Sequence, residues 1–505
     1  MTDDLVLSID SGTTSSRILI YNLKTGKIEA SCQKELKQIF PKSGWMEESA
    51  DEIFSSAVSC MEETLSMIMK KGYKKENIKG IGITNQRETT IVWDKVTKKP
   101  LYNAIVWSDT RTCELVEKLI NLSPEKNANS FMKIVGLPLS TYFSALKLKW
   151  LLEEVDEVKK SYKSGNLLFG TVDCWLIWKL TDGINHVTDV TNASRTMLMN
   201  LSTLKWDDNM CKFFGVEKSI LPTILSSAEL FGVLKLENTK SLLNGLKITG
   251  VLGDQQASLI GQNCVSFGQT KCTYGTGAFL LTNIGEKVLI SKKGLLTTVA
   301  YQFGSKSPPI YAFEGSIPVA AGAINWLKNN LELFNSVDQE FDKMVKAVPD
   351  NGGCYFVPAF YGLFCPHWRS DARGVIVGLS QTVNKNHLCR ATLEAIAFQT
   401  KEILDVISSD SEKLITINTF KIDGGVTKSN CFNQILADIC GLTIDKPESI
   451  EATALGAAVA ATHGLGLTAE HLINQSSKEF CSKLPQVTVD QMYKEWKSAI
   501  IKSIN

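Results

Sequence analysis

The stretch Leu5–Tyr21, LVLSIDSGTTSSRILIY, decides the fold of the first part of the chain. Two apolar, β-prone runs, Leu5–Ile9 and Arg17–Tyr21, flank the polar turn Asp10–Ser16, which predicts a β-hairpin. The turn also suits a phosphate group, because its amides and hydroxyls can donate to oxygens, its glycine permits close approach, and Asp10 can hold hydrated Mg²⁺. Ser, Gly and Asp are also common in ordinary turns, so a plain hairpin is the alternative. No GKS or GKT follows, which excludes a Walker loop.

The segments that follow the hairpin predict an α/β lobe. Lys24–Lys27 turns the chain into a third strand. Ser49 with Glu52 three residues later forms a capping box, and apolar residues recur at helical spacing over 53–68. A buried strand, Ile78–Thr84, comes next. This alternation of strands and a helix is typical of an α/β layer structure.

The second half of the chain repeats this pattern in a weaker form. Ile248–Asp254 reads as a strand that leads into a helix, Thr270–Thr282 as a hairpin, and Thr419–Ile422 as a buried strand. No low-complexity segment or long Pro/Ser linker separates the halves. We therefore expect two large α/β lobes in close contact, joined near residues 250–260, with the ligand site between them.

Composition excludes several classes of protein. The 505 residues carry 54 Lys plus Arg against 53 Asp plus Glu, a net charge of +1, with 44% apolar residues. Near-neutrality argues against a nucleic-acid-binding surface, and no apolar run approaches the ~18–20 residues that span a bilayer. The N-terminus carries Asp3 and Asp4 where a secretory signal would carry basic residues. We expect a cytoplasmic protein with no nucleic-acid and no membrane partner.

The cysteines and histidines predict no metal centre of their own. The thirteen cysteines are scattered singly without a CxxC pair, and the five histidines are not paired at helical ligand spacing. Free thiols in such a pattern are typical of small buried residues in a reducing compartment.

Two further glycine turns follow predicted strands. One is Gly275–Gly277 in the second hairpin, and the other is Asp423–Gly425 after the buried strand. Each alone is a weak signal, because glycine turns are common. Together with the turn at Asp10–Ser16 they are stronger evidence, since turns that face each other from two lobes could hold the phosphates of a nucleotide from both sides.

Polar residues at strand ends suggest an acceptor site. Asp254 ends one strand and could act as a general base or, alternatively, cap the following helix, while Gln255 could hydrogen-bond a polar substrate. Arg87 and Glu88 follow another buried strand and offer a donor and an acceptor to a polyol, for which Trp107 could form a wall. A structural ion pair and a core tryptophan are the alternatives for this second set.

The order of motifs resembles the FGGY family of carbohydrate kinases. The matching segments run from residue 5 to about 465: DSGTTSSR, GITNQRETTIVW, NAIVWSDTR, FGTVDCWLIWKLT, TDVTNASRTML, GDQQASLIGQ, TYGTGAFLL and IDGG. Tyr142–Trp150 resembles the first family signature, and Gly374–Glu394 contains the second. The resemblance implies a two-lobed actin-like ATPase (ribonuclease H-like) fold with duplicated, five-stranded mixed sheets. It also implies an N-terminal domain over 1–256 for polyol and phosphate, and a C-terminal domain over 257–505 for the nucleotide.

The same resemblance assigns site residues. It implies a glycerol site made of Arg87, Glu88, Trp107, Tyr142, Asp254, Gln255 and Phe279. It implies a nucleotide site made of Thr13, Thr14, Ser15, Arg17, Thr276, Ala321, Asn325, Gly425 and Ser429. Asp254 is implied as the catalytic base, Asp10 and Arg17 as its helpers, and Asp10 with Asp254 as the carboxylates near Mg²⁺. Two departures fall on the nucleotide side: Ala321 and Asn325 replace the usual Gly and Gln, and Ser429 replaces the usual Asn.

The activity that this resemblance implies is ATP-dependent phosphorylation of glycerol to sn-glycerol 3-phosphate by a homodimer or homotetramer, for glycerol catabolism and lipid synthesis. A kinase of the same family that acts on a pentulose or erythritol is one alternative. An ATPase of the actin or chaperone type, which uses the fold to bind partners, is another. A catalytically dead scaffold is the third, and the intact Asp10 and Asp254 argue against it.

Overall fold

The predicted N-terminal hairpin forms strands β1 (Leu5–Ser11) and β2 (Ser15–Asn22), paired in antiparallel fashion. Strand β3 (Ile28–Glu35) adds to the free edge of β2, also antiparallel. On the other side β1 pairs in parallel with β6 (Ile78–Asn85), which pairs in parallel with β15 (Lys247–Gly253). The hairpin and the buried strand predicted from the sequence are therefore confirmed.

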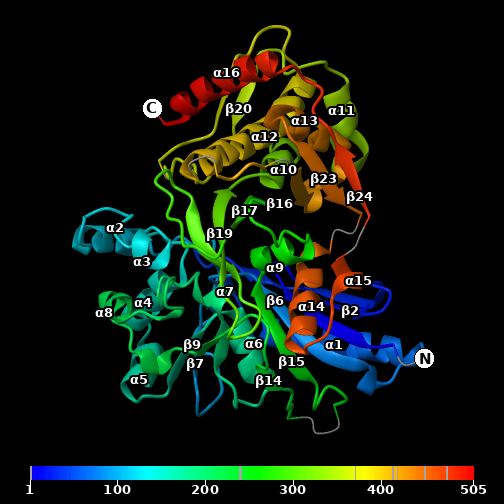
Figure 1. Ribbon diagram of the computed structural model, residues 1–505. Coiled ribbons are helices and arrows are strands. Elements are labelled where there is room, and N and C mark those ends of the chain that lie inside the picture. The colour runs from blue at the N-terminus through cyan, green and yellow to red at the C-terminus, as the bar shows by residue number, and fades with distance from the viewer. Residues whose placement is uncertain are drawn as a thin grey trace.

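The computed structural model describes most of the chain, in two α/β lobes that lie one above the other in Figure 1. The residues described are 3–237, 241–369, 371–411, 414–417, 419–448, 451–473 and 476–504. Within them, no helix combines the length and the apolar character that crossing a membrane requires.

The two main sheets share a five-strand arrangement. The first sheet has the order β14-β15-β6-β1-β2-β3 and the second has β18-β19-β17-β16-β22-β23-β24. Strands β3-β2-β1-β6-β15 correspond in order and direction to β19-β17-β16-β22-β23, which confirms the duplication. The expected five-strand count is wrong at the edges: the described residues add β14 to one sheet and β18 and β24 to the other. The additional strands of both sheets are β14 (Gly232–Val233), β16 (Thr270–Tyr274), β17 (Ala278–Gly285), β18 (Leu296–Tyr301), β19 (Ile310–Ile317), β22 (Thr419–Asp423), β23 (Thr443–Pro447) and β24 (Ser477–Phe480).

Helix α1 (Ala50–Lys70) forms where the cap residue Ser49 and the helical spacing of apolar residues predict a helix. The Ser49 hydroxyl accepts a hydrogen bond from the Glu52 amide at 3.2 Å, which is half of the predicted capping box, and the Glu52 carboxylate accepts from the Lys37 amide at 3.2 Å instead of completing the box. The apolar face of α1 packs on β2 and β3. Helix α12 (Lys385–Asp410) takes the equivalent place in the second lobe, between β19 and β22 in the chain.

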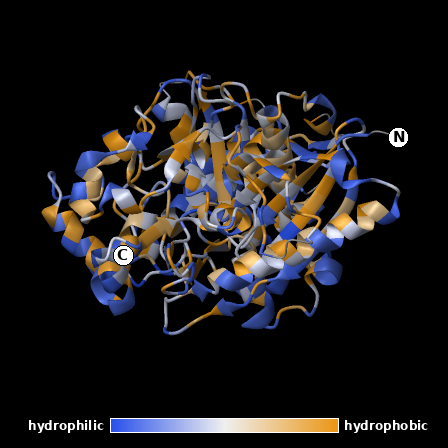
Figure 2. Ribbon diagram, turned by 90° about the horizontal axis from the view of Figure 1, so that it is seen from below, coloured by the Kyte–Doolittle hydropathy of each residue, from blue (hydrophilic) through white to orange (hydrophobic). Residues whose placement is uncertain are grey.

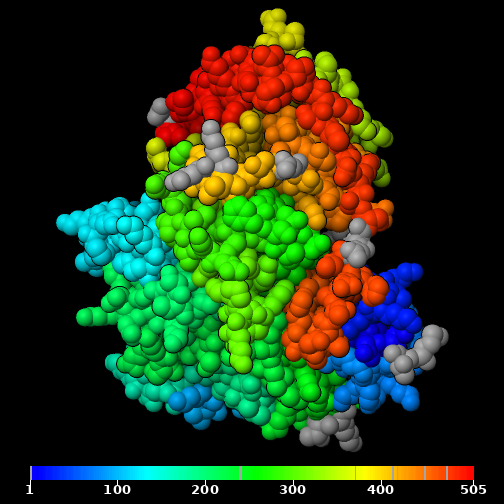
Figure 3. Space-filling view, viewed as in Figure 1, coloured from blue at the N-terminus to red at the C-terminus, as the bar shows by residue number. Residues whose placement is uncertain are grey.

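Two helices cross at the interface between the lobes. Helix α9 (Asp254–Gly261) contacts strands of the second sheet, whereas α14 (Ala452–Gly464), from the second half of the chain, packs on β1, β6 and β15 of the first sheet. Figure 3 shows the orange surface of α14 beside the blue surface of the N-terminal strands. The boundary at residues 256 and 257 stays a prediction, and the packing of α14 means that each lobe uses residues from both halves.

The remaining elements surround the two sheets. The other helices are α2 (Cys113–Leu122), α3 (Met132–Val135), α4 (Ser144–Glu154), α5 (Asp156–Lys163), α6 (Val172–Leu180), α7 (Val190–Ala193), α8 (Asp208–Phe214), α10 (Ala321–Asn329), α11 (Asp342–Lys346), α13 (Asn430–Cys440), α15 (Glu470–Ile473) and α16 (Gln486–Ile504). The short strands are β4 (Gln38–Ile39), β5 (Glu47–Glu48), β7 (Ile91–Asp94), β8 (Ala104–Ile105), β9 (Leu167–Gly170), β10 (Val187–Asp189), β11 (Met199–Asn200), β12 (Lys205–Trp206), β13 (Thr223–Leu225), β20 (Tyr355–Val357) and β21 (Val375–Val377).

Each lobe has its own apolar core. Figure 2, seen from below, shows hydrophobic strands in the interior and hydrophilic faces on the outer helices. Trp175 and Trp178, three residues apart on α6, are buried in the first core, as their spacing predicts. The cysteines are free thiols and most are buried, which matches the expectation of small core residues.

Candidate active site

The turn between β1 and β2 lies at the end of the first sheet. The Gly12 amide donates to the Ser15 carbonyl at 3.0 Å, and this bond closes the turn. Thr14 at its tip is exposed, so its hydroxyl and amide are accessible to a ligand. The Thr13 hydroxyl accepts a 3.0 Å hydrogen bond from the indole nitrogen of Trp107, which links this turn to the predicted acceptor site.

Asp10 stands opposite Arg17 in the β1–β2 ladder. Burial raises the pKa of Asp10 to about 7, against the opposing charge of Arg17 and with help from Asp254 and Glu451. The guanidinium of Arg17 is paired with Glu451 and donates from Nε to Gln33 at 3.0 Å. In this structure Arg17 therefore neutralises a carboxylate that lies just before α14.

The two glycine turns of the second lobe contact each other. Gly424 has φ +92°, and a Cβ there would lie 2.4 Å from the Tyr274 carbonyl oxygen, so only glycine allows this approach. The Thr276 carbonyl accepts hydrogen bonds from the amides of Ala320 and Gly322, which fixes the turn against the start of α10. Thr276 and Gly425 are both exposed, and a Cβ on Gly425 would meet open space.

Three aromatic side chains connect the lobes around the acceptor site. The Trp107 ring meets Tyr142 edge-on at 5.6 Å and Phe279 at 5.8 Å between centroids. Phe279 lies on β17, just after the glycine turn of the second lobe, whereas the other two belong to the first lobe. Lys147 on α4 donates to the Thr141 and Tyr142 carbonyls at 2.8 and 2.6 Å and so holds the loop that carries Tyr142.

Arg87 is the centre of a buried charged cluster. Its guanidinium donates to both oxygens of Glu314 at 2.7 and 2.9 Å and to the Gln256 side-chain oxygen at 3.2 Å. Its Nε lies 3.2 Å from Asp254 Oδ1. Arg87 and Glu88 do not pair with each other, but each belongs to a buried ion pair, Arg87 with Glu314 and Glu88 with Arg195, so the alternative of structural ion pairing stays open beside the role in binding a polyol.

Glu88 is paired with Arg195 instead. Arg195 Nε donates to Glu88 Oε1 at 2.6 Å, and Arg195 Nη2 donates to Glu314 Oε1 at 3.1 Å. Glu88 adopts φ +61°, a left-handed conformation that costs a residue with a Cβ about 1–3 kcal/mol and is often found at binding sites. Glu88, Arg195 and Glu314 are all almost fully buried.

Asp254 begins helix α9 but does not cap it. The N-cap residue is Gly253, and Asp254 Oδ1 accepts only from the adjacent Gln255 amide at 2.7 Å, so the capping alternative is wrong. The side chain of Asp254 is 27% exposed, which leaves it accessible to a substrate. Burial raises its pKa, although the charges of Arg87 and Lys271 oppose that rise.

Gln255 follows the candidate base Asp254, and its side-chain amide oxygen already has a hydrogen-bond donor. Its oxygen accepts from the buried ammonium of Lys271 at 2.7 Å, and this bond orients the amide nitrogen of Gln255. Burial lowers the pKa of Lys271, with Asp423 and Asp254 acting in the opposite direction.

The three nucleotide residues that depart from the family pattern have different surroundings. The Ser429 hydroxyl caps helix α13 by accepting from the Phe432 amide at 3.0 Å, and it also donates to Asp342. Ala321 and Asn325 lie on α10, where Asn325 is exposed. Their role in nucleotide binding stays a prediction.

The predicted magnesium carboxylates fit a divalent cation that is also held by phosphates. Asp10 and Asp254 are close enough for the charge of one to raise the pKa of the other. Among the described residues no cluster of three or more His, Cys, Asp or Glu side chains could bind a metal. Mg²⁺ is commonly held by one or two carboxylates together with water and substrate phosphates, so this donor set suits it.

Sequence reasoning missed Glu314, Arg195, Gln256 and Lys271. Glu314 interrupts the apolar strand β19, IYAFEGSI, and a charged residue in such a strand is a signal that could have pointed to it. Arg195 lies in the segment TDVTNASRTML, which resembles the family, but its partners Glu88 and Glu314 are far away in the chain, so the motif did not indicate its pairing.

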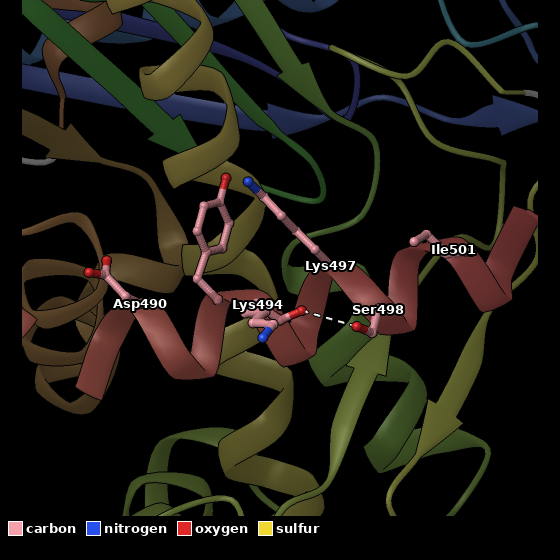
Figure 4. A pocket seen from close by; sticks show the side chains of 6 residues that line it. Asp490, Lys494, Lys497, Ser498 and Ile501 are labelled. Carbon is pink, nitrogen blue, oxygen red and sulfur yellow. Dashed lines mark hydrogen bonds between the residues drawn. The ribbon is translucent and has the colours of Figure 1, made fainter. Parts of the chain in front are cut away.

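Two surface hollows lie away from this cluster. One, of about 390 Å³, runs along α16 and is lined by Asp490, Tyr493, Lys494, Lys497, Ser498 and Ile501 (Figure 4). The other, of about 560 Å³, lies beside α1 and residues 241–242. Neither contains a predicted site residue, so the candidate site is defined by the side chains that meet between the lobes.

A duplicated pair of lobes, glycine turns at strand ends on both lobes, and a largely buried carboxylate in a charged cluster are typical of a two-lobed kinase of the actin-like ATPase fold. Residues 5–261 match the model of the N-terminal domain, and residues 270–465 that of the C-terminal domain, of the FGGY family of carbohydrate kinases. The chain belongs to this family.

Individual relatives are similar over nearly their whole length. A glycerol kinase of Pseudarthrobacter chlorophenolicus is 46% identical, with 99% of this chain and 98% of the relative covered. A glycerol kinase of Chloroflexus aggregans is 45% identical with the same coverage. The crystal structure of Plasmodium falciparum glycerol kinase with ADP superposes with a TM-score of 0.90 at 40% identity, over 100% of this chain and 99% of that one.

Proposed function

We propose that the protein transfers the γ-phosphoryl group of ATP to glycerol, which yields sn-glycerol 3-phosphate and ADP. The observation that carries the proposal is a charged cluster next to a group of aromatic rings: Arg87 pairs with Asp254, the charges of Arg87 and Glu88 act on Tyr142, and Trp107 contacts both Tyr142 and Phe279. The charged and amide groups suit hydroxyls, and the rings suit a short carbon chain. Relatives that are named glycerol kinases and cover nearly the whole chain support the choice of acceptor.

Asp254 is the general base in this proposal. Its carboxylate accepts the proton of the C3 hydroxyl as that oxygen attacks the γ-phosphorus, and the bond from this phosphorus to the oxygen bridging it to the β-phosphate breaks. Burial raises the pKa of Asp254, so the group is a better proton acceptor than an exposed aspartate. Arg87 and Glu88 bind the other hydroxyls, and Gln255 orients the polyol beside the base.

The glycine turns bind the nucleotide phosphates. Thr13, Thr14 and Ser15 offer hydroxyls and amides from the first lobe, and Thr276 and Gly425 offer theirs from the second. Such donors act mainly by positioning the phosphoryl group and stabilising its charge. Arg17 adds a positive charge to this region once its pairing with Glu451 is relaxed. Ala321, Asn325 and Ser429 are proposed to line the adenosine end.

Asp10 and Asp254 are the residues that would hold Mg²⁺. When it is bound, the metal would neutralise negative charge on the β- and γ-phosphate oxygens. Asp10 keeps its carboxylate at the end of β1, where water molecules can bridge it to such an ion.

One assay tests the proposal directly. ADP release is measured with Mg-ATP and glycerol, erythritol, xylulose, ribulose or no acceptor, and the product is identified. Release that depends on glycerol and yields glycerol 3-phosphate is the expected result. Release with a pentulose alone would contradict glycerol as the substrate and keep Asp254 as the base. Release without any acceptor would favour an ATPase that acts on partner proteins.

The oligomeric state, the compartment and the division of the site between the two halves of the chain are also proposed from the sequence and the family. We propose a homodimer or homotetramer, which sedimentation analysis would test. We propose a cytoplasmic enzyme, since all the described cysteines are free thiols. We also propose that residues 1–256 supply most of the polyol and phosphate site and residues 257–505 most of the nucleotide site.

A further inference from the structure

Glu314 is a buried carboxylate of the second lobe that lies between two arginines of the first. It belongs to β19 and is 0% exposed, and both of its oxygens are hydrogen-bonded. Its partners are Arg87, which follows β6, and Arg195, which follows α7. Glu314 is therefore a direct contact between the lobes at the acceptor site.

The geometry of this contact orients Arg87. Glu314 Oε2 accepts from Arg87 Nη1 at 2.7 Å and Oε1 accepts from Nη2 at 2.9 Å, a two-bond pairing that fixes the plane of the guanidinium. The same Oε1 accepts from Arg195 Nη2 at 3.1 Å, and Arg195 Nε donates to Glu88 at 2.6 Å. Glu314 thus contacts Arg87 directly and Glu88 through Arg195.

The hydrogen bonds of Arg87 show which of its N–H donors is available to a substrate. A guanidinium has five N–H donors. The two hydrogens on Nη1 bind Gln256 and Glu314, one hydrogen on Nη2 binds Glu314, and Nε lies 3.2 Å from Asp254 Oδ1 as an ion pair. One hydrogen on Nη2 remains, and its direction is set by the pairing with Glu314. A rotated guanidinium would offer this donor elsewhere.

Glu314 places a buried carboxylate between Arg87 and Arg195, the arginines that also pair with Asp254 and Glu88. Without the Glu314 carboxylate, Asp254 would be the sole anion paired with Arg87. Arg87 would then be drawn toward the proposed base and away from the polyol.

We infer that Glu314 is a positioning residue for the polyol: from the second lobe it holds Arg87 and the Arg195–Glu88 pair of the first lobe in the orientation that binds the acceptor. The inference rests on the proposed function, because it assigns a role within the same acceptor site. It concerns the acceptor and leaves the nucleotide turns unaffected.

The test compares Glu314→Gln and Glu314→Asp with the wild type. Glu314→Gln keeps the shape but loses the charge, and we expect kcat/KM for glycerol to fall about 10²-fold with KM for ATP changed less than about threefold. Glu314→Asp keeps the charge with a shorter reach, and we expect an intermediate loss of about tenfold, a partial rescue. Unchanged kcat/KM for glycerol in either variant, or equal losses toward glycerol and ATP, would overturn the inference.

The matched control is Glu394→Gln on α12. Glu394 is also a buried glutamate, bonded to Arg390 at 2.8 Å and Asn351 at 2.8 Å, but its partners belong to the second lobe alone. We expect it to lower thermal stability and to keep KM for glycerol at the wild-type value. If Glu314→Gln does not fold, Glu314→Asp decides by the criterion above.

The assay separates this inference from the proposed function. If the wild-type enzyme phosphorylates a different polyol, glycerol is wrong as the substrate, and the variants are then compared with that polyol. A selective loss toward it in Glu314→Gln would still support the positioning role. Wild-type behaviour of Glu314→Gln in an enzyme that does use glycerol would overturn the positioning role alone.

Discussion

Two opposing effects act on the pKa of Asp254. Asp254 lies 3.2 Å from Arg87, whose charge favours the carboxylate, and it is largely buried, which favours the neutral acid. Burial has the larger effect, so the pKa rises. The raised pKa suits the proposed role of Asp254 as a proton acceptor, and the ion pair with Arg87 restrains the position of the carboxylate.

We predict that Asp254→Asn lowers kcat at least about 10²-fold while ATP still binds, because the amide cannot take the proton. Steady-state ADP release and calorimetric titration with ATP measure the two effects. Asp173→Asn serves as the comparison, since Asp173 is a buried aspartate that accepts from Thr171 and Thr188 and has no proposed role in the site. Near-normal turnover in Asp254→Asn would exclude this residue as the base.

The neighbouring glycines Gly424 and Gly425 are predicted to respond differently to alanine. Gly424→Ala places a Cβ 2.4 Å from the Tyr274 oxygen at φ +92°, and we expect a loss of about 2 kcal/mol or more in the free energy of unfolding. Gly425→Ala meets open space, so stability should stay within about 0.5 kcal/mol, with a raised KM for ATP. Denaturant unfolding measures the difference, and equal stabilities would contradict the close approach of the two turns.

At the scale of elements, the close crossing of α9 and α14 depends on glycine residues, which have no side chain, at the contact. A Cβ on Gly456 would lie 1.8 Å from the Ala257 carbonyl oxygen, and one on Gly261 would lie 1.9 Å from that of Ala452. Backbone atoms cannot move aside as a flexible side chain can. The two helices therefore pack closely enough to join the lobes, and α14 can lie on the first sheet.

We predict that Gly456→Ala destabilises the protein by about 2–3 kcal/mol, since the added methyl group forces the two backbones apart. The control is Gly322→Ala on α10, where the nearest atom is a side-chain methyl of Val319 at 3.3 Å. There the better helix propensity of alanine keeps stability within about 1 kcal/mol of the wild type. Thermal and urea unfolding check both variants, and a neutral Gly456→Ala would show that the helices pack less closely.

His186 ties α6 and β10 to strand β9. Its Nε2–H donates to the Phe169 carbonyl at 2.9 Å, and its ring lies edge-on to Trp93 and Trp178. Burial lowers its pKa to about 4, from the ordinary value of 6.5. The folded state therefore holds the ring neutral at a pH where the unfolded chain binds a proton.

We predict that this histidine weakens the fold in acid. Because the unfolded state takes up the proton first, stability is complete above about pH 6.5 and is lost as the pH falls toward 4, by about 2–3 kcal/mol in total. His186→Gln removes the titrating group, so its stability should depend less on pH across this window than that of the wild type. Urea unfolding at several pH values measures the difference, and parallel curves would contradict the assignment.

At the scale of the whole molecule, the two lobes are interlocked. Helix α14 covers β1, β6 and β15 although it comes from the far end of the chain. Glu314, Arg87 and Arg195 add a buried charged contact between the lobes. A lobe cut from its neighbour would expose apolar strand faces that α14 now covers.

We predict that a fragment of residues 1–256 does not form a stable fold, whereas the full chain unfolds in one cooperative transition. Calorimetry, near-ultraviolet circular dichroism and binding of a hydrophobic dye to the fragment measure this. A fusion that appends residues 451–473 to the fragment should recover part of the native spectrum, because it restores α14. Cooperative melting of the 1–256 fragment alone would contradict the interlocked arrangement.

Local rules explain what could be predicted from the sequence. The hairpin around Asp10–Ser16, the helix cap at Ser49 and the buried tryptophans of α6 depend on residues a few positions apart, so periodicity and turn chemistry reveal them. The polyol and phosphate residues could be proposed from the sequence because they lie in short motifs, and their roles stay predictions. The structure places Tyr142 against Trp107 and near the charges of Arg87 and Glu88.

The sequence by itself determined the family and the strand turns, because these reside in contiguous motifs, whereas the acceptor residues that it indicates stay a prediction. Tertiary structure alone decided that Arg87 pairs with Glu314 and Glu88 with Arg195, since the partners of each pair are more than one hundred residues apart in the chain. It alone placed α14 on the first sheet as well, through glycine contacts between backbones that are distant in sequence. A buried charge needs a partner of opposite charge, and a local sequence pattern does not indicate which distant residue becomes that partner.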